Sequence, residues 1–533
     1  MANQFDAIIV GGGHNGLVCA NYLAMKGLKV KVLERRSMVG GAAVTEEFHP
    51  GYKNSVASYT VSLLNPKVIK DLELHRHGLK VLERKVNNLW PLENGDFISF
   101  PRGEELYKEI ARFSQKDAEN LDRYFHDIEL VADLIRDFLL ETPPNVGGGI
   151  ADLLKALKLG NRVRKLSLEE ERIVVDIFTK SVDDFLNLYF ENDYVRGAFA
   201  FDGVVGNYAS PHTPGSAYVL MHHAFGEVNG KKGVWGHAVG GMGSITQAMA
   251  ASAREKGVDI ETDAGVDQVL VKDGRAYGVR LASGEELHAR IIASNLNPKL
   301  LYGHLIDKSH LDDDFSRRMD HYKSVSGTFR MNVALNKLPE FICMKQDRFS
   351  ADHLTGGIII GGTIDYLDKA YRDAQEYGWS KKPIVEMLIP STLDDSLAPE
   401  GHHVVSLFCQ QFKPDFSDGS TWDDHEDAAV ETILNTVEEY APGFKASIVG
   451  KQVLSPLGLE RTFGLIGGCI MHGVLSLDQM FSTRPIMGHA DYRGPLKGLY
   501  MCGSGTHPGG GVTGAPGHNA AREILKDVKK RTV

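Results

Sequence analysis

Apolar positions near the N-terminus predict a strand, a helix and a second strand. Residues 8–10 form an uninterrupted apolar, β-branched run, which is typical of a buried parallel strand. Apolar residues then recur at helical spacing from Leu17 to Ala24, and Gly27 is the predicted helix end. A second strand is predicted over residues 29–33. Strand, helix and strand in this order indicate a βαβ unit.

The hydrophobic pattern then changes twice along the chain. Residues 66–200 are predicted to be largely helical, with a boundary or hinge where prolines and glycines interrupt the pattern at 143–149. Residues 258–294 contain three β-rich runs separated by Asp273-Gly274 and Ser283-Gly284, which predict a β-meander followed by a strand over 291–294. Residues 301–489 mix strands such as 402–412 with helices such as 426–444. The pattern as a whole predicts an α/β protein.

The loop between the first strand and helix has G-x-G-x-x-G spacing at Gly11, Gly13 and Gly16. These glycines permit a tight turn, close approach to a pyrophosphate and close helix–strand packing. Glu34 follows 23 positions after Gly11, where an acid meets ribose hydroxyls. Dinucleotide binding is the prediction, and a glycine-rich turn in an ordinary α/β sheet is the alternative.

Two further glycine loops precede helices. The loop at 238–243 follows a poor candidate for a buried strand (233–239), and we interpret it as tight packing at a helix start. The sequence therefore predicts one dinucleotide site.

Near the C-terminus, seven glycines fall within the 15 residues from Gly503 to Gly517, between a predicted strand at 499–502 and a helix from 519. Such a segment brings backbone close to a flat or anionic ligand and favours a flavin over a nicotinamide.

Composition narrows the class of protein. The chain has 533 residues, a length suggesting about three domain equivalents, and a net charge of −10, which argues against a nucleic-acid partner. Five cysteines without a C-x-x-C favour a reducing compartment, so a cytoplasmic location is expected. A strand starting at about residue 5 leaves no room for a leader, and no spanning helix is expected. Basic residues at 158–165 leave peripheral membrane contact open beside an ordinary surface helix.

The segments "GGGHNGL", "VLERRSMVGGAAVT" and "CGSGTHPGGGVTGAPGHNAA", together with the meander, resemble the phytoene desaturase-like FAD-dependent oxidoreductases. The branch that looks most similar is the group of pyridine nucleotide-disulfide oxidoreductase domain-containing protein 2. The resemblance covers almost the whole chain. It implies a discontinuous Rossmann-type FAD-binding domain with a β-meander (1–65, 226–300 and 490–533). It also implies an inserted α+β substrate domain, which comprises residues 66–225 and 301–489.

The resemblance also implies cofactor contacts from three parts of the chain. The residues expected to border the pyrophosphate are Gly11, Gly13, His14, Asn15 and Gly16. Those expected at the adenosine are Glu34, Arg35 and Val266. Those expected at the phosphate, ribityl chain and flavin ring are Gly503, Ser504, Gly511 and Val512. Gly40 and Gly41 match a double glycine after the second strand. Many relatives place a phosphate-directed arginine next, but this chain has Ala42, so that contact is absent or supplied elsewhere.

The expected activity is removal of hydride from a hydrophobic, isoprenoid- or lipid-like substrate to flavin N5, with oxygen or a quinone rather than NAD(P)⁺ as acceptor. His507 is the one catalytic candidate, as a proton relay; the alternative is a histidine that shapes its loop. Residues 201–226, with His212, His222 and His223, are predicted to form a cavity wall, and no metal site is expected. A flavin amine oxidase and a flavin-binding scaffold are the rival functions.

Overall fold

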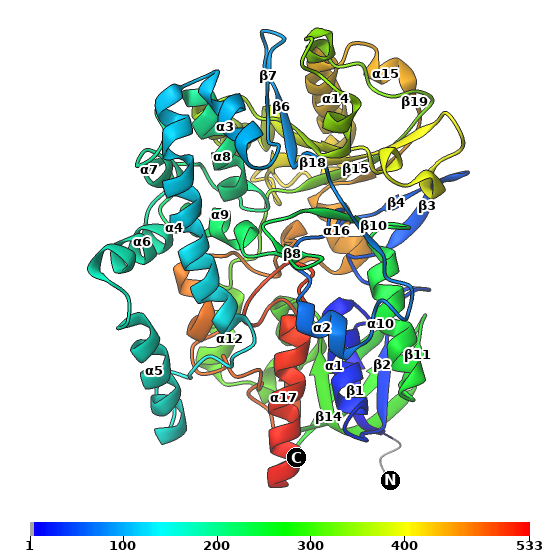
Figure 1. Ribbon diagram of the computed structural model, residues 1–533. Coiled ribbons are helices and arrows are strands. Elements are labelled where there is room, and N and C mark those ends of the chain that lie inside the picture. Colours follow the sequence, from blue (N-terminus) through cyan, green and yellow to red (C-terminus); the bar gives the residue numbers. More distant parts are fainter. Residues whose placement is uncertain (1–4) are drawn as a thin grey trace.

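The computed structural model describes residues 5–533, which form two large sheets surrounded by helices (Figure 1). Residues 1–4, on which the expected absence of a leader rests, lie outside the described residues. The first sheet has the order β11-β2-β1-β14-β13-β12, with β20 also paired to β14. Its strands are β1 (Phe5–Val10), β2 (Val30–Leu33), β11 (Asp259–Glu261), β12 (Val266–Lys272), β13 (Arg275–Leu281), β14 (Glu286–Ser294) and β20 (Leu499–Met501).

The predicted βαβ unit is confirmed. Strand β1 pairs in parallel with both β2 and β14. Its alternate side chains are buried in two apolar clusters on opposite faces of the sheet, with Ile8 and Val10 in one and Ala7 and Ile9 in the other. Helix α1 (His14–Ala24) packs beside α10 (Gly243–Glu255) and α17 (Ala515–Lys530), and the three lie side by side against this sheet (Figure 1). The first sheet thus joins segments from the beginning, middle and end of the chain.

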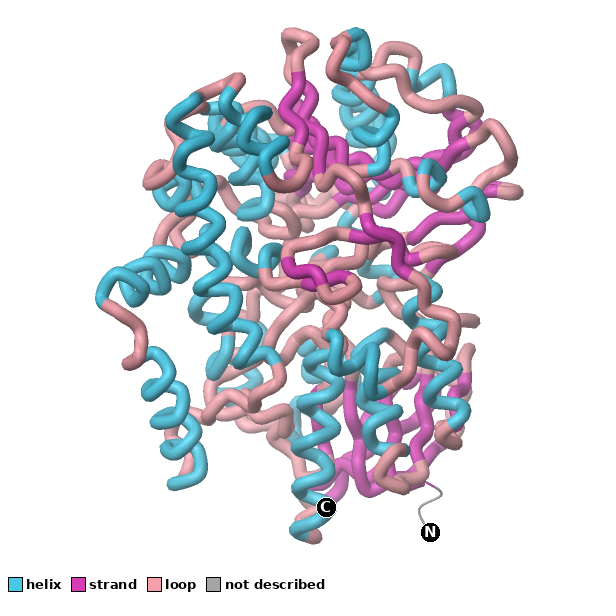
Figure 2. The backbone as a smooth tube through the Cα atoms, viewed as in Figure 1, coloured by secondary structure: helices cyan, strands magenta, loops and turns pink. Residues whose placement is uncertain are grey.

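The second sheet is antiparallel except for one strand pair, and has the order β19-β15-β18-β17-β16-β6-β7. Its strands are β6 (Asn88–Pro91), β7 (Phe97–Ser99), β15 (Phe329–Leu335), β16 (Gly357–Ile360), β17 (Trp379–Leu388), β18 (His403–Phe412) and β19 (Ile448–Leu454). Helix α14 (Trp422–Tyr440) shares a buried apolar cluster with strands β15 to β18. In Figure 2 this sheet lies above the first, with loops between them.

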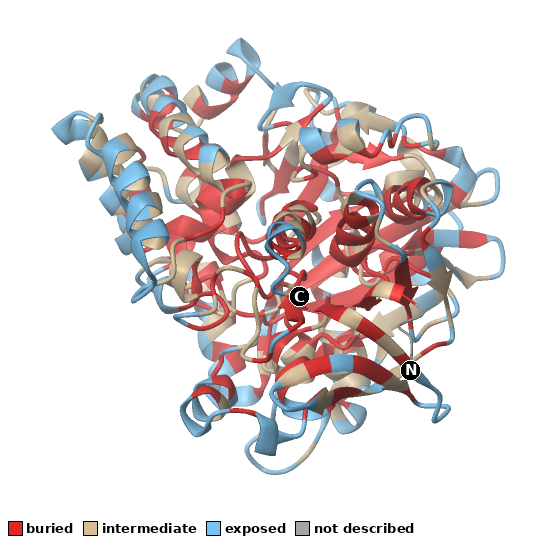
Figure 3. Ribbon diagram, turned by 90° about the horizontal axis from the view of Figure 1, so that it is seen from below, coloured by how far each residue is buried: buried red, intermediate tan, exposed pale blue. Residues whose placement is uncertain are grey.

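A group of helices covers one side of the second sheet. They are α3 (Glu104–Ala111), α4 (Gln115–Leu139), α6 (Leu168–Thr179), α7 (Val182–Leu186), α8 (Asp193–Val204), α9 (Ser216–Ala224) and α13 (Ile364–Tyr377). Their apolar residues form one cluster with sheet residues such as Trp90 and Phe408. Figure 3 shows the buried interior and the exposed outer faces of the helices. Helix α5 (Ile150–Val163) differs, because none of its residues is buried.

Smaller elements connect these layers. They are α2 (Pro66–Asp71), β3 (Thr45–His49), β4 (Tyr52–Ser55), β5 (Val81–Glu83), β8 (Glu227–Val228), β9 (Lys231–Lys232), β10 (Gly236–Ala238), α11 (Pro298–Leu300), α12 (Asp313–Asp320), α15 (Phe444–Ser447) and α16 (Pro456–Phe463). The predicted domain boundaries at residues 65, 225, 300 and 489 stay a prediction.

The prediction that residues 66–200 are largely helical is confirmed, except that residues 81–99 contain strands β5, β6 and β7, with an Asn94-Gly95 turn between β6 and β7. Two other expectations are wrong. The third meander strand and the predicted strand over 291–294 are one strand, β14, which pairs with β13 at one end and β1 at the other. Residues 233–239, judged a poor candidate for a buried strand, do contain a buried strand, β10, but it pairs with β5 outside the first sheet.

Candidate functional site

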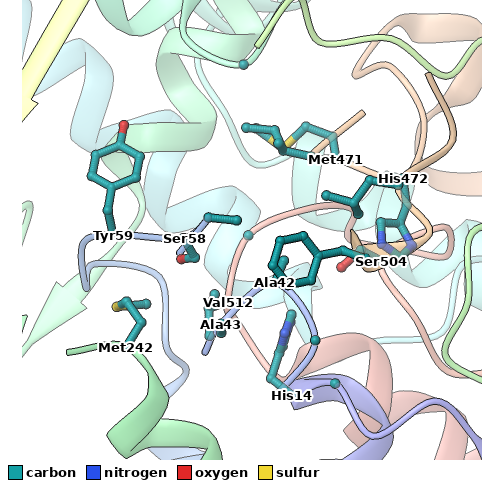
Figure 4. A pocket seen from close by; sticks show the side chains of 18 of the residues that line it. His14, Ala42, Ala43, Ser58, Tyr59, Met242, Met471, His472, Ser504 and Val512 are labelled. Atoms are coloured by element: carbon teal, nitrogen blue, oxygen red, sulfur yellow. The ribbon is translucent and has the colours of Figure 1, made fainter. Parts of the chain in front are cut away.

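A cavity of about 340 Å³ extends from the loops of the first sheet to the second sheet. One end is lined by the glycine loop after β1 and by Glu34 after β2. The other end is lined by Glu386 on β17 and Phe408 on β18. Tyr59 lies across the cavity from Ser504 and His472 (Figure 4). The same cavity therefore joins the predicted nucleotide loops to residues of the predicted substrate region.

The loop after β1 leaves no room for side chains at two of its glycines. A Cβ on Gly16 would lie 2.3 Å from the carbonyl oxygen of Gly11, and one on Gly13 would lie 2.6 Å from Asn295 Nδ2. Gly41 has φ +57°, and its added Cβ would lie 3.2 Å from the Gly13 Cα. Backbone N–H groups at the start of α1 therefore meet the cavity without intervening side chains.

The acid after β2 is held by backbone donors. The Gly12 N–H donates to Glu34 Oε2 (2.8 Å), and the Arg36 N–H donates to Oε1 (2.9 Å). Arg35 also lines the cavity, and its guanidinium donates to the carbonyl of Arg461 (2.9 Å). Val266, at the start of β12, completes this end of the lining.

The C-terminal glycine loop is tied to the N-terminal one. Asn15 Nδ2 donates to the Ser504 hydroxyl across 3.1 Å, although the two residues are 489 positions apart. Gly511 has φ +93°, and its added Cβ would lie 2.7 Å from Leu63 Cδ1. Gly503 packs against the backbone of Asn295, the first residue after β14. This contact network brings both glycine loops to one cavity.

Three polar atoms at this end have no hydrogen-bond partner among the described residues: His14 Nε2, Asn15 Oδ1 and Arg36 Nη1. Burial lowers the pKa of His14 to about 4, so its imidazole is neutral at pH 7. Buried polar atoms without partners cost free energy unless a ligand or water satisfies them. The donors, the acceptor and the side-chain-free backbone fit a bound dinucleotide.

Ten of the fourteen residues predicted to bind the cofactor line the cavity. They are Gly11, Gly13, His14, Glu34, Arg35, Gly41, Val266, Ser504, Gly511 and Val512. The other four, Asn15, Gly16, Gly40 and Gly503, lie behind this lining and pack or hydrogen bond against it. Arg36, which sequence reasoning did not select, also lines the cavity and is a candidate to replace the arginine missing at Ala42.

The histidines separate into two groups. His222 and His223 line the cavity as predicted, whereas His212 lies 3.3 Å from Asp183 in an exposed position. His507 is buried outside the lining, and its Nε2 lies 2.9 Å from the carbonyl oxygen of Phe138. Burial lowers the pKa of His507 to about 4. This position favours the alternative that His507 shapes its loop.

Other chemistry is limited within residues 5–533. No group of three or more His, Cys, Asp or Glu residues there is arranged to hold a metal ion. All five cysteines are buried and unpaired. No helix in that range is both long and apolar enough to cross a bilayer.

Comparisons with known proteins agree with this geometry. Residues 16–328 match the model of the flavin containing amine oxidoreductase family. Pyridine nucleotide-disulfide oxidoreductase domain-containing protein 2 from Rattus norvegicus is 39% identical, over 99% of this chain and 94% of its own. A limonene dehydrogenase subunit from Castellaniella defragrans is 24% identical, over 98% of this chain and 95% of its own. A putrescine oxidase structure with bound putrescine shares the fold, with a TM-score of 0.60, 16% identity and 99% of each chain covered.

Proposed function

Since the chain belongs to the flavin containing amine oxidoreductase family and is an FAD-dependent oxidoreductase, we propose that it dehydrogenates a hydrophobic, isoprenoid- or lipid-like substrate. The observation that carries this proposal is the continuous cavity, whose middle is lined mainly by apolar side chains. They include Leu63, Leu64, Phe201, Val205, Ile470 and Met471. The name of one relative, the limonene dehydrogenase subunit, supports the same class of substrate.

The proposed cofactor contacts follow from the lining. Gly11, Gly13 and the start of α1 would hold the pyrophosphate, with Glu34 at the ribose and Gly511 and Val512 toward the ring. His14 Nε2 and Arg36 Nη1 are free to bond the cofactor because no described protein group satisfies them. FAD bound there supplies a hydride acceptor for a substrate C–H bond.

The chain's own contribution is positioning and exclusion of water. Apolar walls keep the reacting C–H bond dry and in one orientation, and an error of 1 Å in such an arrangement costs about 100-fold in rate. Burial lowers the pKa of His222 and His472 to about 3, so these cavity-lining imidazoles are neutral. The reaction therefore relies on geometry rather than on a charged histidine.

We further propose oxygen or a quinone as the electron acceptor. The glycine loop before α10, which could have formed a second nucleotide site, is filled by Thr45. Its hydroxyl accepts a hydrogen bond from the Gly243 N–H (2.9 Å), and a Cβ on Gly241 would lie 2.3 Å from Thr45 Oγ1. Rapid turnover with NADP⁺ as sole acceptor would contradict this assignment.

Anaerobic titration with a detergent-dispersed acyclic polyene tests the proposed reaction. The visible flavin band is expected to bleach with the polyene and to persist with a small primary amine or NADPH. The Gly13→Asp variant, which places a carboxylate where the pyrophosphate binds, serves as the cofactor-free control. Bleaching by the amine alone would instead assign an amine oxidase, and biological activity undiminished in Gly13→Asp would assign a scaffold.

Helix α5 supports contact with an anionic membrane. Ile150, Leu153, Leu154 and Leu157 lie at helical spacing and are 59–79% exposed. Lys158 and Lys165 are among the basic residues on and just after this helix, which extends away from the body (Figure 1). Native protein is expected to sediment with phosphatidylglycerol vesicles more than with phosphatidylcholine vesicles, and Leu153→Ser/Leu154→Ser to remain in solution. Equal sedimentation of native protein and variant would contradict a role of α5.

A further inference from the structure

The end of the cavity away from the glycine loops contains a buried cluster of charged residues. Arg330 on β15 and Glu386 on β17 both pair laterally with Phe408 on the intervening strand β18. Laterally paired residues project from the same face of a sheet, and Phe408 and Glu386 line the cavity. Arg330 is therefore on the face of the second sheet that closes the cavity, but it is not itself a lining residue: it is fully buried, with its guanidinium against the rings of Tyr59 and Phe408, which do line the cavity.

Two further side chains complete this cluster from outside those strands. Arg84, which follows β5, lines the cavity at 4% exposure and donates to the Thr60 hydroxyl (2.5 Å). Tyr59 donates its hydroxyl proton to Glu386, and its ring lies 4.6 Å from the Arg330 guanidinium carbon. Glu386 is within electrostatic reach of both arginines. We call the lining residues Tyr59, Arg84 and Glu386, together with Arg330 behind them, the polar end of the cavity.

Positive charge exceeds negative charge at this polar end. Both guanidinium groups stay protonated, although burial lowers their pKa. Glu386 supplies one carboxylate. Asp202, a neighbour on the cavity wall, is only partly ionised at neutrality because burial raises its pKa to about 7.

The guanidinium of Arg330 is also incompletely paired. Its Nη2 donates to the Ser406 hydroxyl (2.6 Å), while Nε and Nη1 have no hydrogen-bond partner within residues 5–533. Neither Arg330 nor Arg84 forms an ion pair with a carboxylate in that part of the chain. A wholly hydrocarbon ligand would leave this buried charge uncompensated, at a cost in free energy.

We infer that the polar end binds a carboxylate at one terminus of the substrate, so that the substrate is an amphipathic acid with an unsaturated or isoprenoid chain. The planar guanidinium of Arg84, which lines the cavity, matches a carboxylate's two oxygens. Arg330 adds positive charge from behind Tyr59, and the ligand charge balances the excess. The apolar middle of the cavity then holds the chain beside the flavin. This inference rests on the proposed function, because it names the class of hydrophobic substrate.

Binding of geranylgeranoic acid, its methyl ester and geranylgeraniol to the FAD-loaded enzyme tests the inference. Perturbation of the visible flavin spectrum under anaerobic conditions reports binding without requiring turnover. The acid is expected to bind about tenfold more tightly than the ester or the alcohol, as for one charge-assisted hydrogen bond. The Arg330→Met and Arg84→Gln variants should lose this preference and keep their affinity for the ester.

Glu386→Gln is the opposite test, because it removes a negative charge and keeps the shape of the side chain. Its preference for the acid should equal or exceed that of native enzyme, whereas Arg318→Met, an exposed arginine on α12, should leave the preference unchanged. A merely structural role of the cluster would weaken acid and ester binding together, in the arginine variants and in Glu386→Gln alike.

The outcomes separate the two proposals. Tight, equal binding of acid, ester and alcohol would overturn the carboxylate site and leave the proposed function intact. An acid preference that survives both arginine substitutions would also overturn it. If none of the three compounds perturbs or bleaches the flavin, the hydrophobic substrate itself is wrong, and the inference falls with it.

Discussion

The two ends of the cavity differ in how the chain builds them. The end at the first sheet consists of backbone: glycines, helix N-termini and an acid held by two N–H groups. The end at the second sheet consists of side chains from separate strands, with Arg330 and Glu386 aligned through Phe408. Under the proposed function, backbone would recognise a phosphate-bearing cofactor common to a large family, while side chains would recognise the substrate particular to this protein.

The largest effect is expected at the backbone end. Gly16→Ala should yield protein without FAD, because its Cβ would lie 2.3 Å from a carbonyl oxygen that cannot move without displacing the loop. Gly303→Ala is the matched control, since an added Cβ there meets nothing within 4 Å. The ratio of flavin to protein absorbance measures both. A yellow Gly16→Ala protein with native FAD content would contradict the assignment of the pyrophosphate site.

An intermediate effect is expected at the side-chain end and depends on pH. Below pH 7 Asp202 is neutral and the positive charge of the arginines is least compensated; above pH 7 its carboxylate offsets that charge. The preference for geranylgeranoic acid over its ester should therefore fall as pH rises from 6 to 8, while the ligand itself stays ionised.

The titratable groups beside Asp202, apart from Glu386, do not account for this pH dependence. The pKa of His223 is lowered to about 4, and burial raises those of Tyr59 and Tyr124 well above the range tested. Burial raises the pKa of Glu386 as well, so its ionisation would act in the same direction. Asp202→Asn should make the preference less dependent on pH, and an unchanged profile in this variant would exclude Asp202.

The smallest effect is expected where the two glycine loops meet. Ser504→Ala removes the hydrogen bond from Asn15 and should weaken FAD binding by about 1 kcal/mol, or roughly fivefold. Equilibrium dialysis of FAD against the variant measures this, with Ser309→Ala, in a short helical turn that contains no buried residue, as control. If Ser504→Ala lost as much FAD binding as Gly16→Ala, this hydrogen bond would be required for the conformation of the whole loop.

The sequence was informative where function depends on local backbone. Gly11, Gly13, Gly16 and Glu34 lie within 24 consecutive residues, so their spacing alone indicates the loop. Arg84, Arg330 and Glu386 carry no such signal. Arg330 and Glu386 are brought together by the pairing of β15, β17 and β18, and Arg84 reaches them from the chain after β5. His507 illustrates the opposite kind of error. It lies within the glycine segment in the sequence, but its ring is buried outside the cavity lining.

Errors in secondary structure have the same origin. Strands β6 and β7 have three or four residues each, too few for an alternating pattern to stand out from the helices that follow. Strand β6 pairs with β16, which lies more than 250 residues later in the chain, and β7 pairs in turn with β6. Tertiary pairing of this kind has no local sequence signature.

The first sheet's dependence on β20 has a consequence for biosynthesis. Synthesis proceeds from the N-terminus, yet Ser504, Gly511 and the helix that packs on α1 all follow β20 in the chain. The first glycine loop is synthesised early but stays incomplete until the C-terminal segment has been made, because 489 positions separate Asn15 from its partner Ser504. If FAD binds at the proposed site, its capture is a late event in maturation, and a chain stalled on the ribosome before β20 lacks half of that site.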